Sequence, residues 1–202
     1  MAQLNYLTTV PRLYHHLTEE YSKETNNFVL KHKVAGKYVG ITYDQFKEET
    51  DSFAFGLASL GIGKGDKVSI IAENRPEWVY SDMAILGLGA IDVPLYPSLT
   101  SDSVEYILNN SESKAIIVST KFQLNKVMKI RDKCKTLKYI ILLNEKDADA
   151  SIKDLLSFSK VQELGKDFSK AHPSLLKDNL AIIKPDDICT IIYTSGTTGE
   201  PK

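Results

Sequence analysis

Cysteine is scarce in this chain of 202 residues, which holds only Cys134 and Cys189, far apart in the sequence. Their number and spacing fit neither a disulfide framework nor a metal-ligand pattern. The four histidines also show no metal-ligand spacing. We therefore expect no metal site in this chain and a reducing compartment, most simply the cytoplasm.

The chain also lacks an excess of charge of one sign and any long apolar run. Its 25 lysines and arginines stand against 26 aspartates and glutamates, giving a net charge of -1. No bulk attraction to nucleic acid or to an anionic membrane follows, so a polyanion must be bound locally. No apolar run approaches the roughly 18 to 20 residues needed to span a bilayer, and we expect neither a secretory signal nor a transmembrane helix.

The composition is that of a globular domain, with 43% hydrophobic and 25% charged residues in a chain long enough to bury a core. Apolar, β-rich runs alternate with helical patterns through its middle. Strands are expected over 67–72, 91–95, 115–118 and 139–143, and helices over 76–88, 102–109 and 122–134. Strands that are apolar throughout are buried on both faces. The series therefore predicts an α/β fold with a doubly wound, largely parallel sheet and flanking helices.

Further elements are expected before this core. A helix over 12–23 follows Thr9, whose hydroxyl suits an N-cap. Two extended runs, 27–32 and 37–43, lie on either side of Gly36 and predict a hairpin.

A second helix is expected over 44–60, with Gly61 as a left-handed C-cap. The glycine-rich run 61–66 precedes a strand instead of joining a strand to a helix, so it indicates a tight turn in preference to a dinucleotide-binding loop. After the core, the polar stretch 144–178 is expected to be a surface excursion within the domain, and 188–193 a last strand.

Two features near the first core strand could be mistaken for a substrate site. Asn74 followed by Glu77 has the spacing of a capping box, with Pro76 in the first helical turn, and capping is favoured over a substrate role. Trp78 is the one tryptophan. A packing anchor is favoured over the lining of a ligand path.

Basic residues crowd the run 121–138, where seven lysines and arginines accompany one acid, Asp132. On a helix, Lys126, Lys129 and Lys133 would share one face and apolar residues another. We expect a solvated face on a helix that covers the sheet. The alternative is a peripheral attraction to anionic lipid.

The most specific pattern is the run Tyr193-Thr-Ser-Gly-Thr-Thr-Gly-Glu-Pro-Lys202, which follows an apolar run directly. Glycines allow a close backbone approach to phosphate oxygens, while hydroxyls, backbone N–H groups and a lysine supply donors and charge. The residues expected to hold a polyphosphate are Thr194, Ser195, Gly196, Thr197, Thr198, Gly199 and Lys202. A Walker loop would place Lys and then Ser or Thr after its last glycine, so a kinase or GTPase loop is disfavoured. The alternative is a surface hairpin without a ligand.

This run resembles the phosphate-loop signature of the AMP-forming acyl-CoA synthetases, within the adenylate-forming superfamily that includes luciferases and peptide-synthetase adenylation domains. The resemblance extends upstream, in the expected order, through Ile41-Thr-Tyr43, Gly65-Asp-Lys-Val68, Ala72-Glu-Asn-Arg-Pro-Glu-Trp78 and Ala90-Ile-Asp-Val-Pro-Leu-Tyr96. The sequence Asn-Arg-Pro-Glu-Trp is most similar to that of the long-chain fatty acid branch. The resemblance implies that residues 1–202 are the incomplete N-terminal portion of an AMP-binding domain.

The resemblance also implies a two-step reaction. A carboxylate, here a long-chain fatty acid, attacks the α-phosphate of Mg-ATP to give an acyl adenylate and pyrophosphate, and coenzyme A then takes the acyl group. The run 194–202 would hold the β- and γ-phosphates. The family's Mg2+ ligand, acyl tunnel and catalytic lysine are expected further along the polypeptide. We therefore assign no catalytic residue within this chain, expect it to be inactive alone, and expect small-molecule partners and no nucleic acid.

Two other functions stay open on the sequence. One keeps the adenylate chemistry and changes the acceptor, as in luciferase-like or carrier-protein-loading enzymes. The other is a non-catalytic ligand-binding or interaction module with the same α/β core.

Overall fold

The computed structural model describes residues 8–24, 27–149 and 151–194. Its helices are α1 (Val10–Tyr21), α2 (Tyr43–Ser59), α3 (Pro76–Gly87), α4 (Ser101–Ser111), α5 (Lys121–Met128), α6 (Phe158–Ala171) and α7 (Leu175–Ile182). Its strands are β1 (Phe28–Val34), β2 (Lys37–Thr42), β3 (Lys67–Ile71), β4 (Ile91–Leu95), β5 (Ala115–Val118), β6 (Tyr139–Leu142) and β7 (Leu155–Ser157). The four strands expected from apolar runs are therefore present, each within one residue of its expected bounds.

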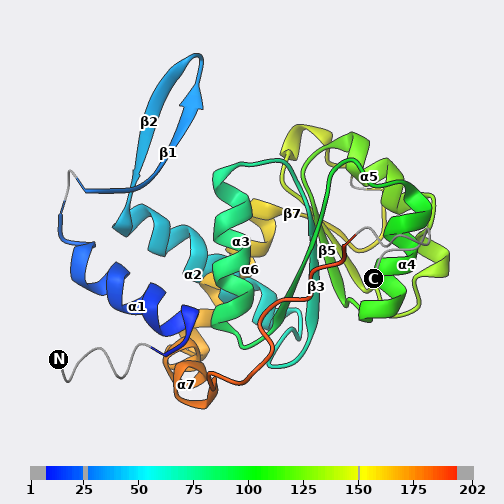
Figure 1. The fold of residues 1–202 in the computed structure, drawn as a ribbon. Coiled ribbons are helices and arrows are strands. Elements are labelled where there is room, and N and C mark those ends of the chain that lie inside the picture. The colour runs from blue at the N-terminus through cyan, green and yellow to red at the C-terminus, as the bar shows by residue number, and fades with distance from the viewer. Residues whose placement is uncertain (1–7, 25–26, 150, 195–202) are drawn as a thin grey trace.

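Strands β3 to β7 form one parallel sheet in the order β4-β3-β5-β6-β7. The whole of β5 is buried, because its apolar side chains meet helices on both faces. Helices α2, α3 and α6 cover one face around Phe53 and Leu57, and α4 and α5 cover the other around Ile107 and Leu124 (Figure 1). The doubly wound, parallel architecture is confirmed.

Strands β1 and β2 form the expected antiparallel hairpin, separate from the main sheet. Its turn holds Ala35 at φ 47° and Gly36 at φ 83°, both in the left-handed region that favours glycine. Leu30 lies opposite Ile41 at the base, where both pack on the core. The rest of the ribbon projects from the body of the molecule (Figure 1).

Local capping explains several helix ends. The Thr9 hydroxyl accepts from the Arg12 backbone N–H, and Gly61, at φ 79°, follows the end of α2 in the left-handed conformation, both as expected. The capping box expected from Asn74 and Glu77 is wrong. Arg75 is the N-cap of α3 and no side chain caps it; its guanidinium instead donates two 2.8 Å hydrogen bonds to the Glu77 carboxylate.

The segment 144–178 differs from the surface excursion expected of it. Within it, β7 pairs in parallel with β6, and α6 packs along α2. Phe158 is buried and stacks on Phe53 with 4.3 Å between ring centroids. The segment is polar in composition because α6 buries only one stripe of its surface. A few apolar residues aligned along that stripe are enough to pack α6 against the core.

Two other predicted elements change on folding. Helix α5 ends at Met128, and a 3-10 turn over Arg131–Lys133 follows, so Lys133 does not share a helical face with Lys126. The strand expected over 188–193 is wrong. That segment makes one parallel bridge, between Thr190 and Asp92 of β4, while Ile188 and Ile192 stay exposed.

Candidate functional site

The candidate phosphate loop begins at Thr194, the last residue that the structure describes. Ser195, Gly196, Thr197, Thr198, Gly199 and Lys202 lie outside the described residues. What the structure does place is the segment that leads into the loop, from the end of α7 to Tyr193. This segment, orange to red in Figure 1, rises from α7 past the sheet, and its last residues lie against α4.

Asp92 of β4 holds this leading segment through two backbone hydrogen bonds. Its N–H donates to the Cys189 carbonyl and its carbonyl accepts from the Ile191 N–H, both at 2.9 Å. The Thr190 hydroxyl lies 3.5 Å from Asp92 Oδ2 and donates to it. Over residues 189–191, the segment therefore runs parallel to β4, toward the carboxyl ends of the strands.

The Asp92 side chain is unusual for its surroundings. It is only 3% exposed, and its Oδ1 has no hydrogen-bond partner among the described residues. Burial, with a smaller contribution from the nearby Asp82 carboxylate, raises the pKa of Asp92 to about 8. Burial alone raises the pKa of Asp82, on α3, to about 6. Our sequence analysis missed Asp92, although a carboxylate inside the apolar run IDVPL was the signal that could have found it.

The end of the leading segment is held against α4. The Tyr193 hydroxyl donates a 2.6 Å hydrogen bond to Asn110 Oδ1, and the Tyr193 ring meets Tyr106 edge to face at 6.4 Å between centroids. Ile191 packs against the apolar core on the same side of the sheet. Thr194 is thus presented from a segment fixed at two places, β4 and α4.

A second polar group lies at the carboxyl ends of β3 and β5. Between these two parallel strands, the order in which successive strands are added to the sheet changes direction. Such a switch point is where open α/β sheets commonly bind ligands. Here two donors are used internally, since Gln123 Nε2 donates to the Pro97 carbonyl at 3.1 Å and Lys126 Nζ to the same carbonyl at 2.6 Å. The nearby Ser119 side chain lowers the pKa of Glu73, while Ser119 Oγ and Gln123 Oε1 are buried without a hydrogen-bond partner among the described residues. The Gln123 amide and the Lys126 ammonium therefore join neighbouring loops, and the Ser119 hydroxyl is the donor of this group without a partner among the described residues.

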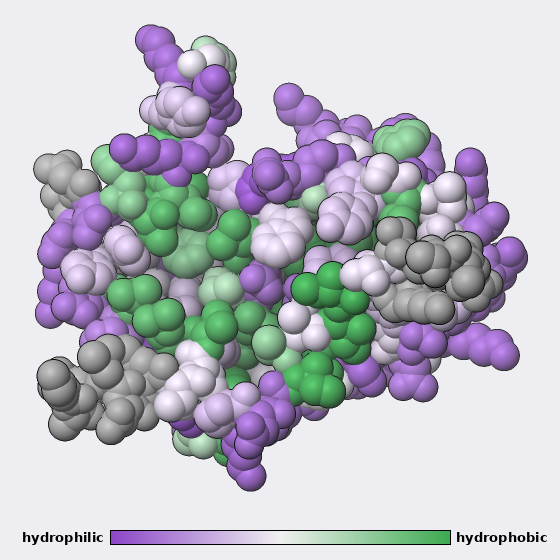
Figure 2. All heavy atoms as spheres, in the orientation of Figure 1, coloured by the Kyte–Doolittle hydropathy of each residue, from purple (hydrophilic) through white to green (hydrophobic). Residues whose placement is uncertain are grey.

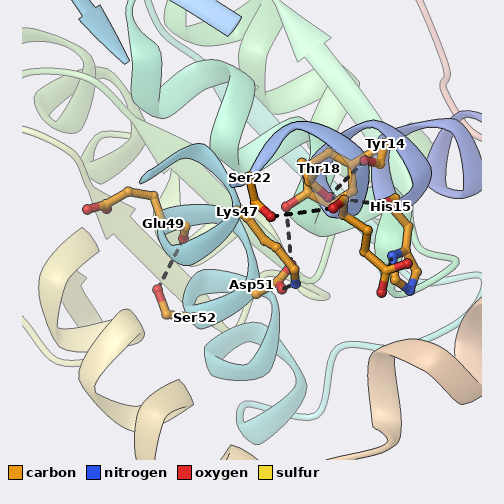
Figure 3. A network of polar contacts seen from close by, with 9 residues as sticks. Tyr14, His15, Thr18, Ser22, Lys47, Glu49, Asp51 and Ser52 are labelled. Carbon is orange, nitrogen blue, oxygen red and sulfur yellow. Dashed lines mark hydrogen bonds and ion pairs between the residues drawn. The ribbon is translucent and has the colours of Figure 1, made fainter. Parts of the chain in front are cut away.

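A cavity of about 50 Å³ lies between α1, α2, α3 and α7. Figure 3 shows the polar contacts beside it, where the Tyr14 hydroxyl donates to Asp51 Oδ1 at 3.2 Å and Lys47 pairs with the same carboxylate. Burial and the Asp51 charge raise the pKa of Tyr14. The volume suits one or two water molecules and is far below the roughly 300 Å³ of a small-ligand pocket. This cavity is therefore not the candidate site.

Metal and membrane features are limited in the part of the chain that the structure describes. Residues 8–24, 27–149 and 151–194 hold no group of three or more His, Cys, Asp or Glu that could bind a metal ion. Over the same residues, no helix has both the length and the hydropathy to cross a bilayer. Cys134 is buried and Cys189 exposed, and both are free.

Comparison with known proteins decides the family. The profile described as AMP-binding enzyme matches residues 19–202, which is most of the chain and includes the candidate loop. The chain belongs to the AMP-binding enzyme family. Fatty acyl-CoA synthetase A of Dictyostelium discoideum is 32% identical over 174 residues, covering 83% of this chain and 24% of that protein. A long-chain-fatty-acid CoA ligase of Xenopus laevis is 30% identical over 193 residues, covering 95% of this chain and 26% of that protein.

Solved structures support the same fold for this AMP-binding chain. The coronafacic acid ligase of Pectobacterium brasiliense, in a mutant form, superimposes with a TM-score of 0.70 at 24% identity, over 90% of this chain and 32% of that one. An anthranilate CoA ligase in complex with anthranoyl-AMP gives a TM-score of 0.66 at 24% identity, over 93% of this chain and 33% of that one. The chain spans about a quarter of the length of the curated relatives it matches.

Proposed function

We propose that this chain is the N-terminal, pyrophosphate-holding portion of an AMP-forming acyl-CoA synthetase that activates a long-chain fatty acid with ATP and transfers it to coenzyme A. The observation that carries the proposal is the run Thr194 to Lys202. It lies inside the family match and comes directly after the segment that Asp92 holds by backbone hydrogen bonds. The names of the relatives, fatty acyl-CoA synthetase and long-chain-fatty-acid CoA ligase, support the substrate class.

In this proposal the chain's own residues bind and orient the leaving group. The hydroxyls and backbone N–H groups of Thr194, Ser195, Thr197 and Thr198 donate to β- and γ-phosphate oxygens, and Lys202 offsets their charge. Gly196 and Gly199 let the backbone come close. Positioning and electrostatic stabilisation of departing pyrophosphate are the main catalytic effects that such a loop supplies.

The donor set fits a polyphosphate and does not by itself complete a Mg2+ site. Hydroxyls and a lysine suit phosphate oxygens, whereas Mg2+ prefers carboxylate oxygens and water. We propose that the Mg2+ ligand and the catalytic lysine come from other parts of the longer protein. Mg2+ bound there would neutralise charge on the phosphates. The cytoplasm stays our predicted location.

The test is carried out in the full-length protein that contains this chain. Lys202→Ala and Thr197→Ala should each lower acid-dependent ATP–pyrophosphate exchange about a hundredfold, the usual effect of removing one donor to developing charge. Lys177→Ala, at an exposed position of α7, is the control and should exchange like wild type. A panel of acids of different chain length reports the substrate class. Wild-type exchange by Lys202→Ala would contradict the role of the loop, and exchange stimulated only by short or aromatic acids would contradict the long-chain assignment.

A further inference from the structure

The β1–β2 hairpin is the one part of the described chain that stands away from the body, and Figure 2 shows it as a largely hydrophilic projection. Its base is fixed, because Leu30 and Ile41 pack on the core. Beyond this pair, the two strands form backbone ladder bonds only with each other, and part of the ribbon borders an open cleft beside α3. Two-stranded ribbons are marginally stable alone, so an exposed ribbon of this length is a candidate for contact with a partner.

The charge of the hairpin departs from that of the whole chain. Residues 27–43 contain Lys31, Lys33 and Lys37 and no aspartate or glutamate, although the chain as a whole carries a net charge of -1. All three lysines are exposed, and none takes part in an ion pair within the described residues. The hairpin therefore carries three positive charges outside any ion pair, Lys31 and Lys33 on one face of the ribbon and Lys37 on the other.

Apolar and aromatic side chains accompany these lysines. Tyr38 is 70% exposed, Val34 49% and Val39 45%. The register places Lys33 opposite Tyr38, and the Lys33 ammonium lies 5.4 Å from the centre of the Tyr38 ring. Apolar side chains between lysines are typical of segments that lie in the interface of a lipid bilayer. Binding of a polyanion in water, by contrast, does not require exposed valines.

A partly open cleft continues the positive surface to the body. It lies between the hairpin and the start of α3, and Lys31, Lys33, Tyr38, Asn74 and Arg75 are among its lining residues. Arg75 is paired with Glu77, so the lysines of the hairpin carry the free charge of this cleft. The cleft has a volume of about 380 Å³, which is large enough for a phosphate-bearing headgroup.

We propose that the tip of the β1–β2 hairpin docks this protein on an anionic lipid surface. Lys31 and Lys33 from one face of the ribbon and Lys37 from the other contact headgroups, while Val34, Tyr38 and Val39 enter the interface. The surface is distinct from the basic run 121–138. There, Lys126 Nζ donates to the carbonyls of Pro97 and Leu99, and Lys133 pairs with Glu105. The inference does not depend on the proposed synthetase function.

Vesicle co-sedimentation of the 202-residue chain tests the inference. Vesicles of phosphatidylcholine alone are compared with vesicles that also contain phosphatidylserine, at low and at physiological salt. Two hairpin variants are used, the charge variant Lys31→Gln/Lys33→Gln/Lys37→Gln and the apolar variant Val34→Ser/Tyr38→Ser. The control, Lys121→Gln/Lys129→Gln/Lys135→Gln, removes the same charge from exposed positions of the basic run. Circular dichroism first checks that each variant is folded.

The expected result is binding to the phosphatidylserine vesicles that falls about a hundredfold in the charge variant, from the contribution of three lysines near an anionic surface. Binding should also weaken in the apolar variant and stay close to wild type in the control. Three outcomes would overturn the inference: no binding to phosphatidylserine vesicles, loss of binding only in the control variant, or an unaffected apolar variant. The last outcome, together with tight binding of a DNA duplex, would indicate a polyanion partner in place of a membrane.

Discussion

At the scale of single residues, Asp92 is the group whose chemistry departs most from its ordinary behaviour. It is buried in β4 beside Asp82, and it also holds the segment that leads to the candidate loop through backbone hydrogen bonds. Its pKa of about 8 in the folded chain lies well above the roughly 4 of an aspartate in an unfolded chain. The folded state therefore holds a proton that the unfolded state releases.

This difference predicts how stability changes with pH. Because the folded chain binds the extra proton, stability from this group is full below about pH 4 and is lost as pH rises toward about 8. Asp82, with a folded pKa of about 6, acts in the same direction up to that pH. Urea denaturation of the wild type should show a free energy of unfolding that falls steadily from pH 4 to pH 8.

Asp92→Asn should remove most of the slope between pH 6 and pH 8 and raise the stability at pH 8, since an amide resembles the protonated carboxyl. Asp186→Asn, at an exposed position shortly before Thr190, is the charge-matched control. If Asp92→Asn keeps the wild-type slope above pH 6, ionisation of Asp92 is not the cause.

At the scale of elements, the contact between α2 and α6 depends on two glycines. A methyl group at Gly165 would lie 1.9 Å from the Ser52 carbonyl oxygen, and one at Gly56 would lie 2.0 Å from the Val161 carbonyl oxygen. Both obstacles are backbone atoms, which cannot rotate away as a side chain can. The two helices therefore approach closely only because neither residue carries a Cβ.

Gly165→Ala should destabilise the chain by about 3 kcal/mol or more, because overpacking at a backbone contact forces α6 away from α2. Gly63→Ala is the control, since a methyl group there meets nothing within 4 Å, and its effect should stay within about 0.5 kcal/mol. Thermal denaturation followed by circular dichroism compares the two. Equal stability of both variants would mean that α2 and α6 do not pack as closely as described.

At the scale of the whole molecule, the chain corresponds to only part of the length of its relatives. It belongs to the AMP-binding enzyme family but spans about a quarter of its curated relatives. The segment that leads to the candidate loop is held by hydrogen bonds to β4 and α4. Ile188 and Ile192 on this segment are exposed. The cavities beside α1 and beside the leading segment, of about 50 and 150 Å³, are below the roughly 300 Å³ of a small-ligand pocket.

The isolated chain is therefore expected to have no synthetase turnover. Incubated with Mg-ATP, a long-chain fatty acid and coenzyme A, it should release AMP no faster than a reaction without protein, because no catalytic residue is assigned within this chain. The full-length protein is the positive control. AMP release by the purified chain above background, and dependent on the fatty acid, would show this expectation to be wrong.

Much of the fold could be predicted because the signals are local. The four apolar runs became β3 to β6, Thr9 caps α1 and Gly36 and Gly61 occupy left-handed turns. Two failures, those over 144–178 and 188–193, share one physical cause, the absence of a local signal for a distant partner. Residues 155–157 became a strand by pairing with β6, and 188–193 remained mostly unpaired because it meets β4 at one position.

The sequence by itself determined the family, through the run Tyr193 to Lys202 and the upstream segments, and it determined the alternation of strands and helices. These features depend on residue type and spacing along the chain. Only the tertiary structure decided that Asp92 is buried beside Asp82, that α6 packs on α2 through glycines, and that a positively charged hairpin stands clear of the body. Burial, close approach and exposure depend on which residues become neighbours in space. Those neighbours are distant in the sequence, so these properties arise only when the chain folds.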